Sequence, residues 1–273
     1  MRDTATQYHG LTIPAHRPAI ILFQPQMPEN IGMVARAMAN CGLDELRIVQ
    51  PRDGWPHEKA FPSASGADTI LHNAKLYDDL PTAVADRTLV FGTCAFEREL
   101  VKPILTAETA ATAIIQSHAT AGTSNSAIIF GPERTGLTKD DMSLCDGIIT
   151  LPLNPDFASL NIAQSVLLVA YCWWQKAVME PLITPGAQQA PDILNILALQ
   201  DGEVASQKDI EHLYEHALWA LKEKNYFTNP QNIPAQERNA RSFLQRMRLT
   251  LQETRTAHGM IKALLDGKMW VKD

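Results

Sequence analysis

The chain has 273 residues, of which 45% are apolar and 20% are charged, as expected of an ordinary soluble protein that can bury a full core. Its first residues lack the apolar segment of a signal peptide, and the longest apolar run, near Val166 to Trp174, is too short to span a bilayer, so we expect a cytoplasmic protein without a membrane segment. The net charge of −6 argues against a nucleic-acid binder, although the distribution of charge matters more than its sum.

Short apolar runs alternate with helical patterns along the first two thirds of the chain. The helical patterns lie around 30–41, 106–118 and 160–178. Strands that alternate with helices indicate an α/β fold with a mostly parallel sheet and helices on both of its faces. The apolar runs predict buried strands at 19–24, 46–50, 88–93, 126–130 and 147–151.

The last part of the chain differs in character from the rest. Prolines and a glycine at 181–191 indicate a linker, and helical patterns follow at 206–225, 234–248 and 250–265. Residues 1–202 carry 13 basic and 21 acidic side chains, whereas residues 203–273 carry 11 basic and 9 acidic ones. The predicted organisation is a domain at 1–180, a linker at 181–202 and a small all-α extension at 203–273.

Three segments place polar residues at the carboxyl end of a predicted strand, where open α/β sheets bind ligands. In the first, Pro28 suits the first turn of a helix, Asn30 lies at its start and Arg36 follows on the same strand–helix unit. Taken alone, these residues also fit a helix cap and a solvated arginine. The third segment, 151–161, is a proline-stiffened loop that leads into an apolar helix, which either Ser159 or Asn161 can cap.

The second segment runs from Gly131 to Leu137 and has the glycine spacing of a P-loop without its lysine. Glu133 would also repel phosphate groups, so the loop suits a neutral or cationic ligand better than a nucleotide triphosphate. The glycines allow backbone to approach such a ligand closely. A tight strand-to-helix turn with one exposed glutamate is the alternative.

Together the three segments are more specific than any one of them. P-E-N-I-G-x-x-x-R-x-x-x-x-x-G, then F-G-x-E-x-x-G-L, then L-P with S-L-N opening a helix, resembles the SpoU branch of the SPOUT RNA 2′-O-methyltransferases over residues 19–175. The Asn154-Pro155-Asp156 insert and the helical tail are similar to the TrmJ-like members. These methylate cytidine or uridine at position 32 of the tRNA anticodon loop.

The resemblance implies a trefoil-knotted domain that acts as a homodimer and binds S-adenosylmethionine through backbone. Its long helix, 160–178, would pack against its twin with a surface that includes Tyr171, Trp173 and Trp174. The implied cofactor-binding residues are Thr93, Cys94, Ala95, Gly131, Leu151, Ala158, Ser159 and Leu160.

The implied reaction is attack of a ribose 2′-hydroxyl on the sulfonium methyl group. Arg36 would lie at the ribose, either as the base or as a group that clamps phosphate and stabilises developing alkoxide, with Ser159 and Asn30 orienting it and the RNA. The alternatives are another tRNA position, ribosomal RNA, or a non-catalytic RNA-binding protein on the same fold.

Basic residues predict where tRNA binds. The TrmJ-like proteins carry two arginines after the fourth strand, whereas here Phe96 replaces the first and only Arg98 matches. In the tail the alternative is that arginines pair with the acidic body. The predicted RNA contacts are Arg98, Arg238, Arg241, Arg246 and Arg248, with Arg255 and Lys262 beyond them.

The cysteines predict no metal site. They are scattered, with neither a C-x-x-C pair nor a histidine at zinc spacing, so reduced thiols are expected. They are Cys41, Cys94, Cys145 and Cys172.

Overall fold

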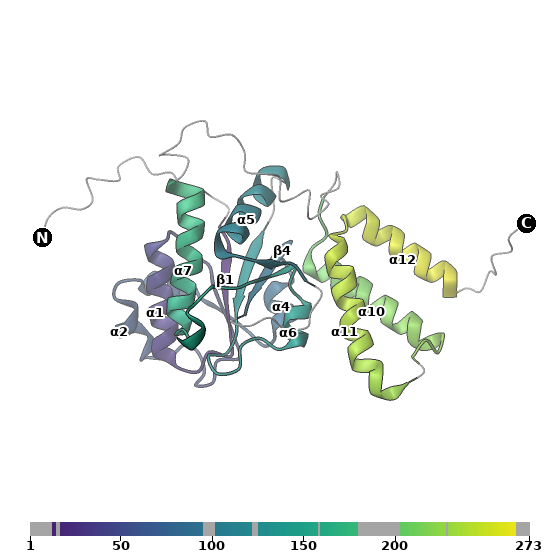
Figure 1. Cartoon of the computed structure of the whole chain (residues 1–273), viewed down its shortest axis with the longest axis horizontal. Helices are drawn as coiled ribbons and strands as arrows, with labels where there is room; N and C mark the ends of the chain where they lie inside the picture. The colour runs from purple at the N-terminus through teal and green to yellow at the C-terminus, as the bar shows by residue number, and fades with distance from the viewer. Residues whose placement is uncertain are drawn as a thin grey trace, which may run out of the picture.

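The computed structural model describes residues 13–14, 17–94, 102–121, 125–157, 159–179, 203–227 and 229–265. Its centre is a sheet of seven parallel strands in the order β3-β2-β1-β6-β4-β7-β5 (Figure 1). The five predicted strands are confirmed, and two short edge strands, β3 and β5, add to them. The strands are β1 (Ala19–Phe23), β2 (Leu46–Val49), β3 (Lys75–Tyr77), β4 (Leu89–Thr93), β5 (Ile104–Leu105), β6 (Ser126–Phe130) and β7 (Gly147–Ile149).

The apolar strands bury both faces of the sheet. Ile20 and Leu22 of β1 belong to one core and Ile21 to the other, because successive side chains of a strand point to opposite faces. The larger core lies beneath α1 (Pro28–Asn40), α2 (Ala60–Ala64), α3 (Asp68–Asn73), α5 (Ala107–Ala121) and α7 (Ile162–Trp174). The smaller core lies beneath α4 (Leu80–Val84) and α6 (Lys139–Ser143). Helices therefore cover both faces, as predicted.

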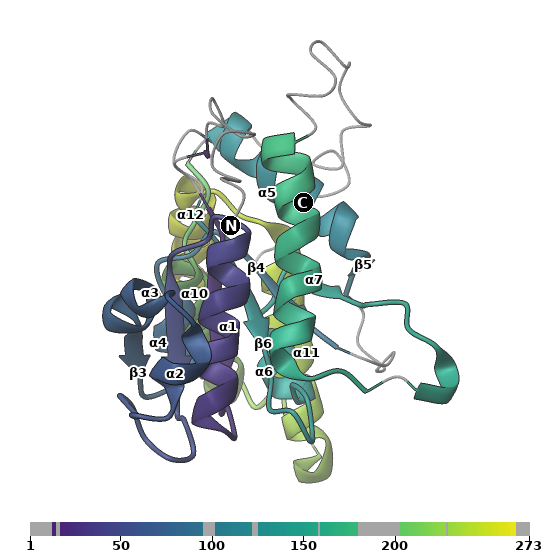
Figure 2. The same ribbon diagram turned by 90° about the vertical axis from the view of Figure 1, so that its left-hand side faces the viewer.

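Helix α7 runs beside α1 over the larger core, and a π-helix, Gln175–Met179, extends it (Figure 2). Tyr171 is 52% exposed, but Trp173 is only 1% exposed and belongs to the core. The prediction that Trp173 lies on the helix surface is wrong, because it shares the inward stripe of Val166 and Val169 at helical spacing. Trp174 is partly buried against the same core.

The tail is helical, as predicted, and it docks on the sheet domain. It consists of α10 (Gln207–Glu223), the 3-10 turn Pro230–Asn232, α11 (Ile233–Met247) and α12 (Leu251–Leu265). The backbone N–H of Gln207 donates to Arg87 O at 2.8 Å, and Gln245 Nε2 donates to Leu144 O at 2.8 Å. The predicted linker, 181–202, lies outside the described residues.

The order of the strands is consistent with the knotted fold. β7 follows both β4 and β5 in the chain yet lies between them in the sheet. The connection from β4 to β5 includes residues 95–101, which lie outside the described part of the chain. The knot itself therefore stays a prediction.

Candidate functional site

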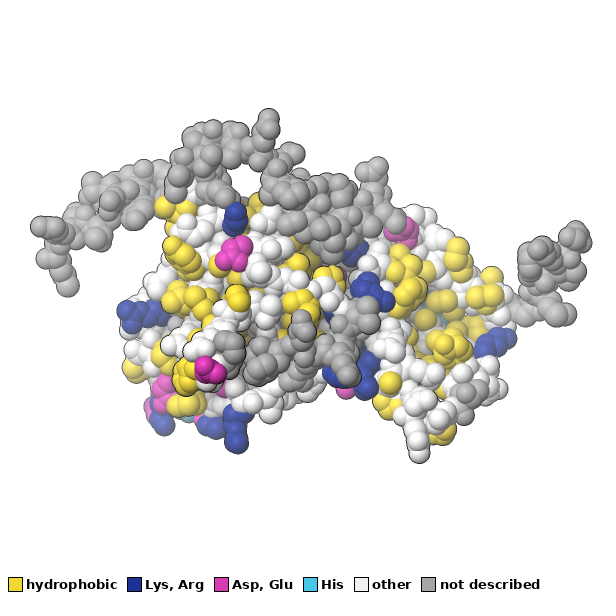
Figure 3. All heavy atoms as spheres, in the orientation of Figure 1, with side chains coloured by type: hydrophobic (Ala, Val, Ile, Leu, Met, Phe, Trp, Pro, Cys, Tyr) yellow, Lys and Arg dark blue, Asp and Glu magenta, His cyan; other side chains and the backbone are white. Residues whose placement is uncertain are grey.

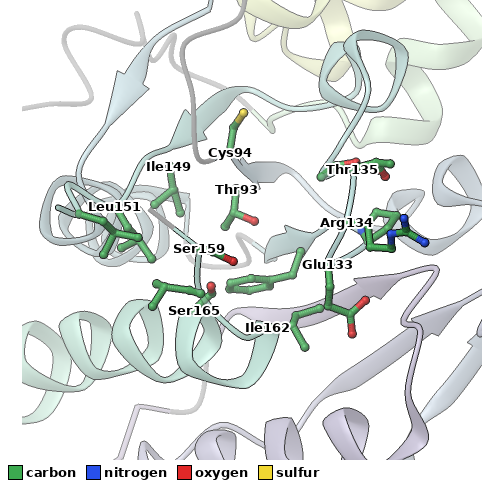
Figure 4. Close-up of a pocket in the computed structure, with 16 residues that line it drawn as sticks. Thr93, Cys94, Glu133, Arg134, Thr135, Ile149, Leu151, Ser159, Ile162 and Ser165 are labelled. Atoms are coloured by element: carbon green, nitrogen blue, oxygen red, sulfur yellow. Dashed lines mark hydrogen bonds between the residues drawn. The ribbon is translucent and has the colours of Figure 1, made fainter. Parts of the chain in front are cut away.

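A cavity of about 410 Å³ lies at the carboxyl ends of β4, β6 and β7 and is lined by the second and third motif segments. Figure 4 shows Glu133, Arg134 and Thr135 along one side of it and Ile149 and Leu151 along the other. The volume is within the range of small-molecule sites, and the position is where parallel sheets bind ligands. The lining residues are Thr93, Cys94, Phe130, Gly131, Pro132, Glu133, Arg134, Thr135, Gly136, Ile149, Leu151, Leu153, Ser159, Leu160, Ile162 and Ser165.

A chain of hydrogen bonds ties the three segments together. Asn30 Nδ2 donates to Glu133 Oε1 at 2.9 Å, and Asn161 Nδ2 donates to Asn30 Oδ1 at 3.0 Å. The backbone N–H of Gln26 donates to the other carboxylate oxygen at 3.2 Å. Asn30 is only 5% exposed, so water cannot satisfy its amide group, and these hydrogen bonds do so instead.

The direction of this chain is fixed at both ends. Asn161 Oδ1 accepts from Ala163 N at 2.8 Å, so its Nδ2 must serve as the donor to Asn30. The Oδ1 of Asn30 accepts this bond from Asn161, so the Nδ2 of Asn30 remains as a buried donor and requires an acceptor. The carboxylate of Glu133 is that acceptor, so its role is to hold the loop in place rather than to face a bound anion.

The 131–137 loop is folded too tightly for a side chain at its first residue. A Cβ on Gly131 would lie 2.6 Å from Leu137 N and 2.7 Å from the carbonyl carbon of Gly136. Gly136 has a φ of +62°, and its N–H donates to Pro132 O at 2.8 Å, which closes the turn. The two glycines are therefore needed for the shape of the loop itself.

The third segment ends at the N-terminus of α7, beside the cavity. Asn161 is the N-cap, and its N–H donates to Gln164 Oε1 at 3.1 Å in a capping box. Of the two predicted caps, Asn161 fills the position. Ser159 instead lines the cavity, close to Ser165 in Figure 4.

Most of the predicted cofactor-binding residues line this cavity. Thr93 is among them, but its hydroxyl donates to Ile129 O at 3.1 Å, which leaves its backbone to face the cavity. Ala95 and Ala158 lie outside the described residues. The predicted residues found in the lining are Thr93, Cys94, Gly131, Leu151, Ser159 and Leu160.

The residues predicted to act at the ribose lie in different places. Ser159 lines the cavity, whereas Asn30 is buried next to it in the hydrogen-bond chain. Arg36 is exposed on α1, with Nη1 3.4 Å from Ser65 Oγ, and does not line the cavity of its own chain.

Several lining residues were not predicted from the sequence. Pro132, Arg134 and Thr135 lie between the two glycines, so the spacing that located the loop already contained them. Leu153, Ile162 and Ser165 flank the polar residues of the third segment. Nothing in their type distinguishes them from ordinary loop and helix residues.

The predicted RNA contacts in the tail fall into two groups, those that pair within the chain and those that are exposed. Arg241 pairs with Glu211 at 2.6 Å and lies over the Tyr214 ring, and Arg238 is 3.5 Å from Asp140.

Arg248 also pairs within the chain. It is 6% exposed, with Nη1 3.9 Å from Asp146, whose carboxyl pKa is raised by burial. These three take part in packing within the chain. The side chains exposed to solvent are Arg246, Arg255 and Lys262.

The rest of the described chain adds no metal centre. No group of three or more His, Cys, Asp or Glu side chains within it is arranged to hold a metal ion. Burial raises the pKa of the Cys41 thiol to about 11 and that of Cys145 to about 12, so both stay protonated near neutral pH. Among the described helices, none has the length and apolar character to cross a membrane.

The parallel sheet and the cavity at its carboxyl edge define an α/β protein with a pocket where such sheets bind small molecules. The sequence profile of the SpoU rRNA Methylase family matches residues 17–171. The chain belongs to this family.

Named relatives refine the position of the chain within the family. The chain is 32% identical to the tRNA (cytidine/uridine-2′-O-)-methyltransferase TrmJ of Cronobacter sakazakii, over 90% of this chain and 94% of that protein. It is 32% identical to the tRNA (cytidine/uridine/adenosine-2′-O-)-methyltransferase TrmJ of Pseudomonas aeruginosa, over 73% and 75%. The crystal structure of TrmJ from Z. mobilis ZM4 superposes with a TM-score of 0.77 and 40% identity, over 91% of this chain and 99% of that one.

Proposed function

We propose that this protein transfers the methyl group of S-adenosylmethionine to a ribose 2′-hydroxyl in tRNA. The observation that carries the proposal is a cavity lined by the second and third motif segments, which the Glu133–Asn30–Asn161 hydrogen-bond chain joins to the first segment. A turn with unrelated capping residues would not require such a chain.

The cavity fits S-adenosylmethionine in size and in chemistry. Of the two charged residues in its lining, Glu133 is already bonded to Gln26 N and Asn30, and Arg134 is exposed to solvent; the other lining residues are uncharged. The residues that would hold the cofactor are Thr93, Cys94, Gly131, Leu151, Ser159 and Leu160. When bound, the cofactor supplies a methyl group already activated by its sulfonium.

The protein itself must align the ribose, assist the loss of the 2′-hydroxyl proton and stabilise the negative charge that develops on the oxygen. Arg36 can bind the flanking phosphate and stabilise developing alkoxide, which an arginine does more readily than accept a proton. Ser159 can donate a hydrogen bond to the ribose or the RNA backbone from the cavity wall. Asn30 acts indirectly, because both of its amide atoms are engaged in holding the loops.

Homodimer formation would use the exposed face of α7 and α1. Leu167, Leu168 and Tyr171 of α7 are 40%, 42% and 52% exposed, and Met33 of α1 is 39% exposed. α1 and α7 pack together, and Figure 3 shows hydrophobic side chains exposed over these two helices, so these side chains can form one apolar surface for a second copy. Arg36 follows Met33 by about one helical turn on this side of α1, so we infer that it acts on the cavity of the partner subunit.

The tRNA substrate is supported by the activity for which a relative that aligns over 90% of this chain is named. Within tRNA we propose cytidine or uridine at position 32 of the anticodon loop. In the tail, the exposed Arg246, Arg255 and Lys262 would bind phosphates. Methylation of another tRNA position or of ribosomal RNA is the second candidate.

The proposal is tested with purified protein, methyl-labelled S-adenosylmethionine and unmodified tRNA transcripts. Nucleoside mass spectrometry of the product should show 2′-O-methylcytidine or 2′-O-methyluridine, and sequencing of the modified transcript should place it at position 32. A transcript in which position 32 is a deoxynucleotide should accept no methyl group. Methylation of a base, or a protein that does not bind the cofactor, would contradict the proposal.

A further inference from the structure

We propose that Phe157 is a stacking platform for an unpaired nucleobase of the RNA substrate at the mouth of the cavity. This inference rests on the proposed function. Phe157 is 76% exposed, and no large apolar side chain in the described part of the chain is more exposed. A single exposed apolar residue means little by itself, so the argument depends on where and how this one is held.

Phe157 lies between two stretches that both line the cavity. Leu151 and Leu153 line it before the turn, and Ser159 and Leu160 line it afterwards. Two residues of extended chain span at most about 7 Å, so the Phe157 backbone lies within that distance of Ser159. A ribose whose 2′-hydroxyl enters the cavity therefore brings its own base or a neighbouring base within reach of the ring.

A hydrogen-bonded turn holds the backbone of Phe157. The 3-10 helix Pro155–Phe157 is closed by Asn154, whose carbonyl accepts from Phe157 N at 2.9 Å and whose Oδ1 accepts from Asp156 N at 3.1 Å. Figure 2 shows this loop standing out from the body beside the N-terminal end of α7. A ring held on such a turn loses less conformational freedom on stacking than one on an open loop.

The charges near the ring favour a base over the RNA backbone. Asp156, next to Phe157, is exposed and would repel a phosphate. On the other side of the cavity, Arg134 is exposed in the lining and suits a phosphate. Proteins read single-stranded RNA by splaying bases onto aromatic rings, and an anticodon-loop nucleotide is accessible in this way.

The test compares Phe157→Ala, Phe157→Leu and Phe157→Trp in steady-state methylation of tRNA transcripts. Loss of the stacking that one aromatic residue provides should lower kcat/KM for the transcript about tenfold or more in the Ala and Leu variants. The Trp variant should keep its activity, because it retains an aromatic ring. Affinity for S-adenosylmethionine should stay unchanged in all three. Leu76→Ala is the matched control, because Leu76 is 52% exposed on the edge strand β3, at the far edge of the sheet.

The results that would contradict the role of Phe157 differ from those that would contradict the proposed function. A Leu variant as active as the wild type would show that the ring does not stack, and a change in molar mass by light scattering would assign Phe157 to contact with a second copy. Either result overturns this inference and leaves the proposed function standing. A wild-type protein that binds S-adenosylmethionine but methylates no RNA would overturn the proposed function, and this inference with it.

Discussion

Replacement of Asn30 by alanine tests whether the hydrogen-bond chain holds the cofactor site together. The change removes the donor to Glu133 Oε1 and the acceptor for Asn161 Nδ2 at a position that is 5% exposed. A hydrogen bond to a charged group contributes roughly 1.5–3 kcal/mol and a neutral one roughly 0.5–1.5 kcal/mol. The free energy of unfolding should therefore fall by about 2–4.5 kcal/mol, the sum of the two contributions.

The same substitution should weaken S-adenosylmethionine binding, because Glu133 and the 159–161 segment both belong to the cavity wall or its support. Urea unfolding measures the first effect and isothermal calorimetry the second. Gln26→Ala is the matched control in the same segment. Only the backbone N–H of Gln26 reaches Glu133, and the side chain donates to Gln24 O, so the control should leave cofactor affinity intact.

The reasoning is refuted if Asn30→Ala lowers the free energy of unfolding by less than about 1 kcal/mol, the size expected for a polar group that water can satisfy. It is also refuted if stability falls as expected while cofactor affinity equals that of the control. The first outcome would show that Asn30 is solvated, and the second that the loops keep their shape without the hydrogen-bond chain.

Further predictions separate chemistry, loop shape and RNA binding. Arg36→Ala should lower the methylation rate roughly 10²-fold with unchanged cofactor affinity, as single-turnover kinetics and calorimetry would show, and near wild-type turnover would exclude Arg36 from the reaction. Gly131→Ala should raise the Kd for S-adenosylmethionine about tenfold or more, because its Cβ meets backbone at 2.6 Å, whereas Gly259→Ala, with nothing within 4 Å, should not. Arg246→Ala with Arg255→Ala should weaken tRNA binding and its salt dependence in filter-binding titrations, whereas Arg248→Ala should lower the melting temperature instead, since Arg248 is buried. Activity should survive a strong chelator as long as the RNA stays folded, and a stoichiometric metal in the purified protein would contradict this.

The positions of the strands and the closeness of the three motif segments were predictable from the sequence, because both follow from simple rules. Continuous apolar runs such as 126–130 have to be buried on two faces, and parallel strands carry the loops after them to one edge. The short elements were missed: β3 has exposed residues at an edge, and α2 and α6 have too few residues to show a helical period.

Side-chain roles that depend on long-range partners could not be predicted. The apolar character of Trp173 and Tyr171 is similar, and only the register of α7 against the sheet puts the first in the core and leaves the second exposed. Likewise, nothing in the sequence distinguishes Arg246 from Arg248, which are both arginines at the end of α11. Arg248 has a φ of +45° and its side chain points towards Asp146. Which arginine faces solvent is decided by the docking of the tail.

The position of Glu133 explains why an acidic residue belongs in a loop with phosphate-loop spacing. The proposed cofactor site is built from segments more than 100 residues apart in sequence, and each must be held by groups that do not compete with the ligand. A carboxylate accepts two N–H donors at once, one from backbone at Gln26 and one from Asn30, which a neutral side chain of similar size cannot do as well. Both of its oxygens are engaged in this way, although Glu133 is one of the residues that line the cavity. The charge that excludes a nucleotide triphosphate is thus the same charge that shapes the loop for a cationic cofactor.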